Sequence, residues 1–150
     1  MNFGFSFVGL LFLIMLFVPN IIWSKYKPIG YDEFSKNENR VLLILERIGE
    51  VLVTCLALLT DIKFSWSLIL AIAFILMVLY EMYWVKYFKS NHTMDDMYSS
   101  FLSIPLPGAT LPVLAILLLG IYANNIILVI SALILGIGHI GIHYNHSQEI

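Results

Sequence analysis

Residues 126–144 read IILVISALILGIGHIGIHY, an apolar run whose polar side chains before the final tyrosine are Ser131, His139 and His143. A helix needs about 20 mostly apolar residues to cross the ~30 Å hydrocarbon core of a bilayer. The run therefore predicts a transmembrane helix, and its two histidines are the first sign that this helix does more than anchor the chain.

Four further stretches have the same character, at residues 3–23, 41–59, 64–85 and 104–122. The first has no Lys or Arg before it and no small-residue cleavage pattern after it, so we expect a mature helix rather than a signal peptide. The chain is predicted to be all-α: a polytopic membrane bundle of five transmembrane helices forming one domain over residues 1–150.

Composition agrees with membrane insertion. Hydrophobic residues make up 60% of the chain and charged residues 12%, whereas soluble domains average about 45–50% and about 25%. The formal net charge of −2 offers no basic footprint for nucleic acid. A single cysteine, Cys55, excludes an internal disulfide and a cysteine-rich metal site. The expected partner is the lipid bilayer itself.

The basic residues predict an orientation. With five spans, segments 24–40 and 86–103 lie on the same side of the membrane as the C-terminus. They contain Lys25, Lys27, Lys36, Arg40, Lys86 and Lys89, whereas the opposite side has only Lys63. The positive-inside rule places the N-terminus outside and the C-terminus in the cytoplasm. We expect the plasma (inner) membrane.

Segment 86–103 contains a pattern of its own. Met94, Met97, Tyr98 and Phe101 recur at helical spacing, and Thr93 can cap the helix with Asp96 three residues later. This predicts a short amphipathic helix at the membrane interface between the third and fourth spans.

Short connections at 60–63 and 123–125 predict two antiparallel hairpins, one of spans 41–59 and 64–85 and one of spans 104–122 and 126–144. Spans 41–59, 64–85 and 126–144 carry the intramembrane charges, so we expect these three to pack together.

The polar residues inside the spans are the candidate site. They are Glu46, Arg47, Glu50, Glu81, His139 and His143. Residues four apart share a helix face, which aligns Glu46 with Glu50 and His139 with His143. At 1.5 Å per residue, Glu46, Glu81 and His139 each lie roughly 6–7 Å from the inner ends of their helices. His146 is expected beyond the hydrocarbon.

The face of span 126–144 that carries the histidines is predicted to continue through Gly136 and Ala132 and to exclude Ser131 and Leu128. A structural interpretation of the cluster is also open, because Arg47 can pair with Glu50 or Glu81 and buried histidines often serve helix packing. Three carboxylates facing one Arg nevertheless leave negative charge that a proton, a metal or a cationic ligand must compensate.

Three functions follow from the cluster. The leading hypothesis is proton- or cation-linked transport or relay, because buried Glu and His titrate near neutrality. The second is a metal-assisted intramembrane enzyme acting on a lipid-like substrate, with a divalent metal held by Glu46, Glu50, His139 and His143. The third is a non-catalytic accessory subunit of a membrane complex or homo-oligomer. The sequence leaves open whether the chain is an enzyme.

Overall fold

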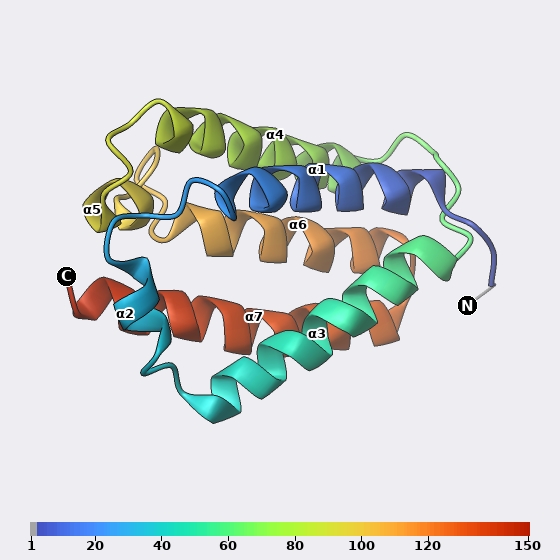
Figure 1. Ribbon diagram of the computed structural model, residues 1–150. Coiled ribbons are helices and arrows are strands. Elements are labelled where there is room, and N and C mark those ends of the chain that lie inside the picture. Colours follow the sequence, from blue (N-terminus) through green and yellow to red (C-terminus); the bar gives the residue numbers. More distant parts are fainter. Residues whose placement is uncertain (1–2) are drawn as a thin grey trace.

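The structure is a computed structural model that describes residues 3–150. These residues form helices and no named strand, which confirms the all-α class. The helices are α1 (Phe7–Trp23), α2 (Tyr31–Ser35), α3 (Arg40–Leu59), α4 (Leu68–Phe88), α5 (Met94–Tyr98), α6 (Pro107–Tyr122) and α7 (Ile126–Gln148). Figure 1 shows α2, α5 and the C-terminus gathered at one end of the bundle.

The helix boundaries follow from local capping. Asn39, Ser67 and Asn125 each accept a hydrogen bond from the first turn of the helix that follows, which satisfies backbone N–H groups that have no partner within the helix. Pro107 begins α6, a position where its missing N–H costs nothing. These caps place the starts of α3 and α7 within one residue of the predicted spans.

Two of the five predicted spans, α4 and α7, are long and apolar enough to cross a membrane by length and composition. Helices α1 and α6 are apolar but shorter. Helix α3 has 20 residues but includes Glu46, Arg47 and Glu50. The structure is therefore compatible with membrane insertion and supports it most directly through α4 and α7.

Helix α6 is the centre of the bundle. It packs against α4 on one side and α7 on the other, and α7 in turn packs against α3. Helix α1 contacts α3, α4 and α6, and Figure 1 shows α3 crossing α7 obliquely. The predicted hairpin of α6 and α7 is present.

The other predicted hairpin is not a packed pair, because α3 lies against α7 rather than α4. Glycines explain the choice: a Cβ on Gly49 of α3 would lie 2.5 Å from the Leu135 Cα of α7, and one on Gly138 of α7 would lie 2.6 Å from the Leu42 carbonyl oxygen of α3. Only glycine allows backbones this close. The expectation that spans 41–59, 64–85 and 126–144 form one group was wrong.

Because α7 packs against both α3 and α6, its buried face is wider than the predicted stripe. Leu128 and Ser131 are buried together with Ala132 and Gly136, so the prediction that they lie off the packed face was wrong. A single stripe suffices for one neighbouring helix, whereas α7 has a large contact surface on each of two sides.

Helix α5 has the predicted cap. The Thr93 hydroxyl accepts from the Asp96 N–H, and the Asp96 carboxylate accepts from the Thr93 N–H, which is a complete capping box. Its apolar side faces the protein rather than lipid, because Met97 and Tyr98 are buried in the core. The Tyr83 hydroxyl of α4 donates to the Met97 carbonyl at 2.6 Å and holds α5 against the bundle end.

Candidate polar cavity

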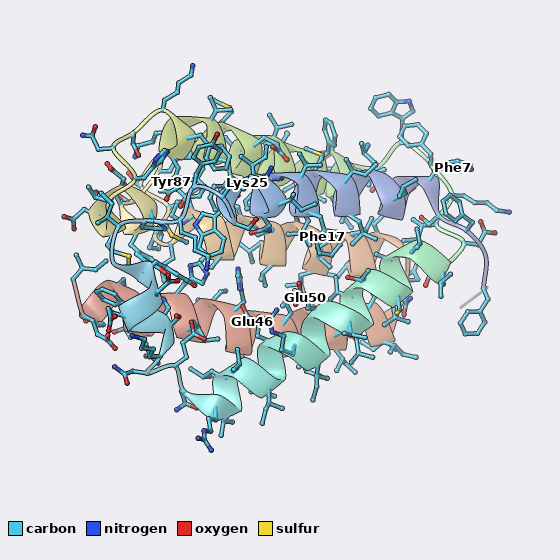
Figure 2. The ribbon with its side chains drawn as sticks, viewed as in Figure 1. Phe7, Phe17, Lys25, Glu46, Glu50 and Tyr87 are labelled. Atoms are coloured by element: carbon cyan, nitrogen blue, oxygen red, sulfur yellow. The ribbon has the colours of Figure 1, made fainter. Side chains whose placement is uncertain are left out.

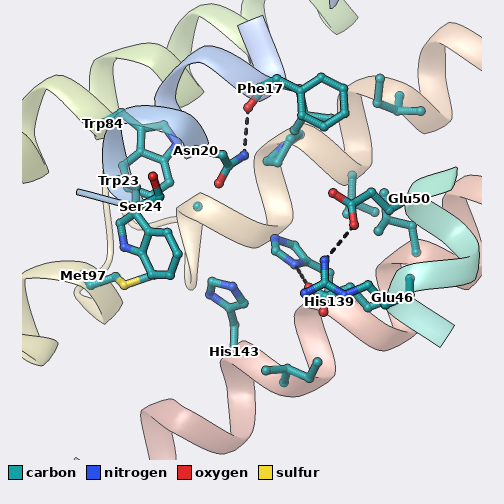
Figure 3. A pocket seen from close by; sticks show the side chains of 18 of the residues that line it. Phe17, Asn20, Trp23, Ser24, Glu46, Glu50, Trp84, Met97, His139 and His143 are labelled. Carbon is teal, nitrogen blue, oxygen red and sulfur yellow. Dashed lines mark hydrogen bonds and ion pairs between the residues drawn. The ribbon is translucent and has the colours of Figure 1, made fainter. Parts of the chain in front are cut away.

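A cavity of about 280 Å³ lies between α1, α3, α6 and α7 near the end of the bundle that carries α2 and α5. Figure 3 shows acidic and imidazole side chains on one wall and Trp23 and Trp84 on another. Five of the six residues in the predicted cluster line it, namely Glu46, Arg47, Glu50, His139 and His143.

The closest polar contact in the cavity joins α3 to α7. Nδ1 of His139 lies 2.5 Å from Oε1 of Glu46, with 25% and 16% of the two side chains exposed. An ionised carboxylate only accepts hydrogen bonds, so the proton between them is on Nδ1 and His139 is the donor. Gly138 makes this contact possible, because it brings the α7 backbone directly against α3 one residue before His139.

Arg47 and Glu50 form a second pair at the mouth of the cavity. Arg47 Nη1 donates to Glu50 Oε2 at 3.0 Å, and 68% and 39% of their side chains are exposed. Figures 2 and 3 show Glu50 above Glu46, on the same side of α3. The pair is electrically neutral, so the charge state of the inner wall depends mainly on Glu46 and His139.

Glu81 does not belong to this cavity. It lies on α4, which packs against α6, while α3 packs on the far side of α7. The predicted pairing of Arg47 with Glu81 is therefore absent, and Arg47 pairs with Glu50 alone among the residues described. Glu46 and His139, which were predicted at similar distances from their helix ends, are in contact, but position along a helix does not determine which helices are neighbours.

The histidines of α7 continue beyond His139. The His143 ring lies 4.4 Å from the His139 ring, measured between centroids, and 5.5 Å from the ring of Tyr98 on α5. His146, expected beyond the hydrocarbon, is only 2% exposed, because α2 and α5 fold over it. Its Nδ1 lies 2.9 Å from the Tyr98 hydroxyl.

Sequence analysis missed Glu38 and Tyr98 as members of this region. Glu38 lies between α2 and α3 and lines the cavity from the bundle end. Burial raises the pKa of its carboxyl, and the negative charge of Glu46 raises it further, while Arg47 opposes both effects. No span periodicity could indicate these residues, because both lie in connecting segments.

The proposed metal ligands do not converge. Within residues 3–150, no three His, Cys, Asp or Glu side chains lie close enough together to hold one ion. Glu50 forms an ion pair with Arg47. The positive charge of Arg47 also acts on Glu46 and opposes the binding of a second cation there. The geometry gives no support to a divalent metal on Glu46, Glu50, His139 and His143.

Comparison with known proteins assigns no relationship: no protein-family profile, curated protein or solved structure matches this chain.

Proposed function

We propose that the chain is a five-span integral membrane protein of the plasma (inner) membrane, with its C-terminus in the cytoplasm, and that its cavity supports proton-linked transport or proton relay. The hydrogen bond between Glu46 and His139 is the observation that carries this proposal.

Exposed apolar side chains support the five spans. Leu11, Ile14 and Val18 are exposed along α1, Ile44, Ile48 and Val51 along α3, and Ile130, Leu133 and Ile137 along α7. Continuous apolar surface on helices is expected where lipid covers it. The 17 residues of α1 are within the range of about 17–25 for a spanning helix, and the 16 of α6 fall just below it.

The acid–imidazole pair has two protonation states that differ little in geometry. Without an added proton, Glu46 is charged and His139 is neutral. Uptake of one proton converts the pair to carboxylate and imidazolium, which are together neutral. The Arg47–Glu50 pair is neutral in both states. One proton therefore switches the Glu46–His139 pair from negative to neutral, which is the change needed to exchange a proton for a cation.

Proton flux in liposomes tests this proposal. The purified protein is placed in vesicles with a pH-sensitive dye inside, and an imposed pH gradient is followed as it dissipates. We expect Glu46→Gln to reduce the protein-dependent rate at least tenfold, because the amide cannot hold the charge that makes His139 a proton acceptor.

Glu81→Gln is the matched control. It removes a carboxylate at a similar predicted depth but outside the cavity, and its rate should equal that of the wild type. Wild-type flux no greater than that of empty vesicles would contradict the proposal and favour the accessory-subunit hypothesis. An equal loss in both variants would show that the cavity is not the route.

A further inference from the structure

A line of titratable side chains leads from the cavity toward the end of the bundle. From Glu46 and His139 it continues to His143, whose ring lies 4.4 Å from that of His139, and then to Tyr98. The Tyr98 hydroxyl and His146 Nδ1 are 2.9 Å apart. These groups come from α3, α5 and α7, so the line exists only in the folded chain.

The outer part of this line ends at an unsatisfied atom. His146 Nε2 is buried and makes no hydrogen bond, and it lies 3.5 Å from Oε1 of Glu38. The rings of Tyr31 and Phe34 stand edge-on to the imidazole at 5.6 and 5.9 Å. A buried nitrogen without a partner is costly, so its retention beside a carboxylate calls for an explanation.

Glu38 connects two hollows. It lines the cavity described above, and it also lines a second hollow of about 410 Å³ at the surface, together with His146, Asn145 and Glu149. This second hollow has a mostly polar lining and lies next to the C-terminus. Water in it would reach Glu38 directly.

We infer that Glu38, His146 and Tyr98 form a proton-access arm that connects the second hollow with the Glu46–His139 pair. This inference rests on the proposed function and identifies the side from which the pair is loaded.

Each group in the arm gives one proton and takes one. The Glu38 carboxyl passes its proton to His146 Nε2, and His146 releases the proton on Nδ1 to the Tyr98 oxygen. Tyr98 then gives its own hydroxyl proton to His143 through a bridging water, because no direct hydrogen bond joins the two rings, whose centroids are 5.5 Å apart. A second water or a rotation of the His143 ring bridges the remaining step to His139. No bond other than those to hydrogen changes, and no oxidant or other reactant is needed.

The surroundings suit these roles. Burial raises the pKa of the Tyr98 hydroxyl, so Tyr98 stays protonated between transfers and acts as a donor and acceptor rather than as an anion. Burial likewise raises the pKa of Glu38, which keeps the acid form available at a higher pH than for a solvated carboxyl. The other titratable groups around His146 are Tyr31, His143, Glu149 and, more distantly, Glu46.

A pH-jump experiment in lipid nanodiscs tests the arm independently of transport. Protons are released by light, and time-resolved infrared spectroscopy follows protonation of the pair through the imidazolium band that His139→Gln removes. We expect Tyr98→Phe to slow this band at least tenfold without changing its final amplitude, because the variant keeps the ring and loses only the hydroxyl. Glu38→Gln, in a connecting segment away from the core, should slow it similarly.

Tyr83→Phe is the matched control. It removes a buried hydroxyl that bonds the same helix, α5, but lies off the line, and the band should rise at the wild-type rate. Wild-type rates in both Tyr98→Phe and Glu38→Gln would overturn the arm and show that protons enter through the mouth at Arg47. Absence of a His139 imidazolium band would overturn it as well.

The arm and the proposed function can fail separately. An arm-dependent band in a protein without vesicle flux would uphold the arm and refute transport. Flux that depends on Glu46 but is unchanged in Tyr98→Phe would uphold transport and refute the arm.

Discussion

Gly138→Ala tests the helix crossing that creates the candidate site. The new Cβ would clash with the Glu46 backbone nitrogen and lie 2.6 Å from the Leu42 carbonyl oxygen, whereas ordinary contact begins at 3.4 Å, so α3 and α7 would have to separate by more than about 0.8 Å. The obstructing atoms belong to backbone and cannot rotate away. Overpacking of this kind costs roughly 1–3 kcal/mol, and obstruction by backbone favours the upper part of that range. The higher helix propensity of alanine offsets about 1 kcal/mol of this cost.

Thermal unfolding in detergent micelles measures this cost. Near-ultraviolet circular dichroism reports on the buried aromatic residues of α4, and a loss of about 2 kcal/mol corresponds to a fall in Tm of roughly 4–8 °C for a chain of this size. The same separation should lengthen the contact between Glu46 and His139, because Gly138 precedes His139 and packs on the Glu46 backbone.

Gly141→Ala is the control on the same helix. Its Cβ would meet only the tip of the Leu42 side chain, at 3.0 Å from Cδ1, and a leucine tip can move. We expect its Tm to equal or slightly exceed that of the wild type. Equal Tm values for wild type, Gly138→Ala and Gly141→Ala would refute the view that backbone proximity determines the pairing of α3 with α7.

Two further predictions concern charge and topology. In a double-mutant cycle in micelles, Arg47→Ala and Glu50→Gln should show a coupling of about 0.5 kcal/mol, because 68% and 39% of the two side chains are exposed at the mouth of the cavity, where water weakens the ion pair; a coupling of several kcal/mol would mean that the pair is buried. A cytoplasmic reporter fused after Ile150 should be active and a periplasmic reporter inactive, as the six Lys and Arg residues on that side require, and the opposite result would overturn the five-span topology.

Local sequence patterns were enough to predict where the long helices lie and at which positions along them the polar groups fall. Apolar runs and caps such as Asn39 and Asn125 are local features, and they placed α3 and α7 closely. The capping box of Thr93 and Asp96 could likewise be predicted from the spacing of the two residues. Helical rise alone put Glu46 and His139 at one level, because 1.5 Å per residue applies wherever a helix is continuous.

Only the tertiary structure decided which helices are neighbours. Apolar helix faces are nearly interchangeable, so a short connection such as 60–63 did not make α3 and α4 a packed pair, and Glu81 was separated from the site. Close backbone approach at Gly49 and Gly138 selected α7 as the partner of α3 instead. Tertiary packing also places α2 and α5 over His146 and brings Glu38 and Tyr98 beside it. Contacts between distant segments depend on complementary shape rather than on periodicity within either segment.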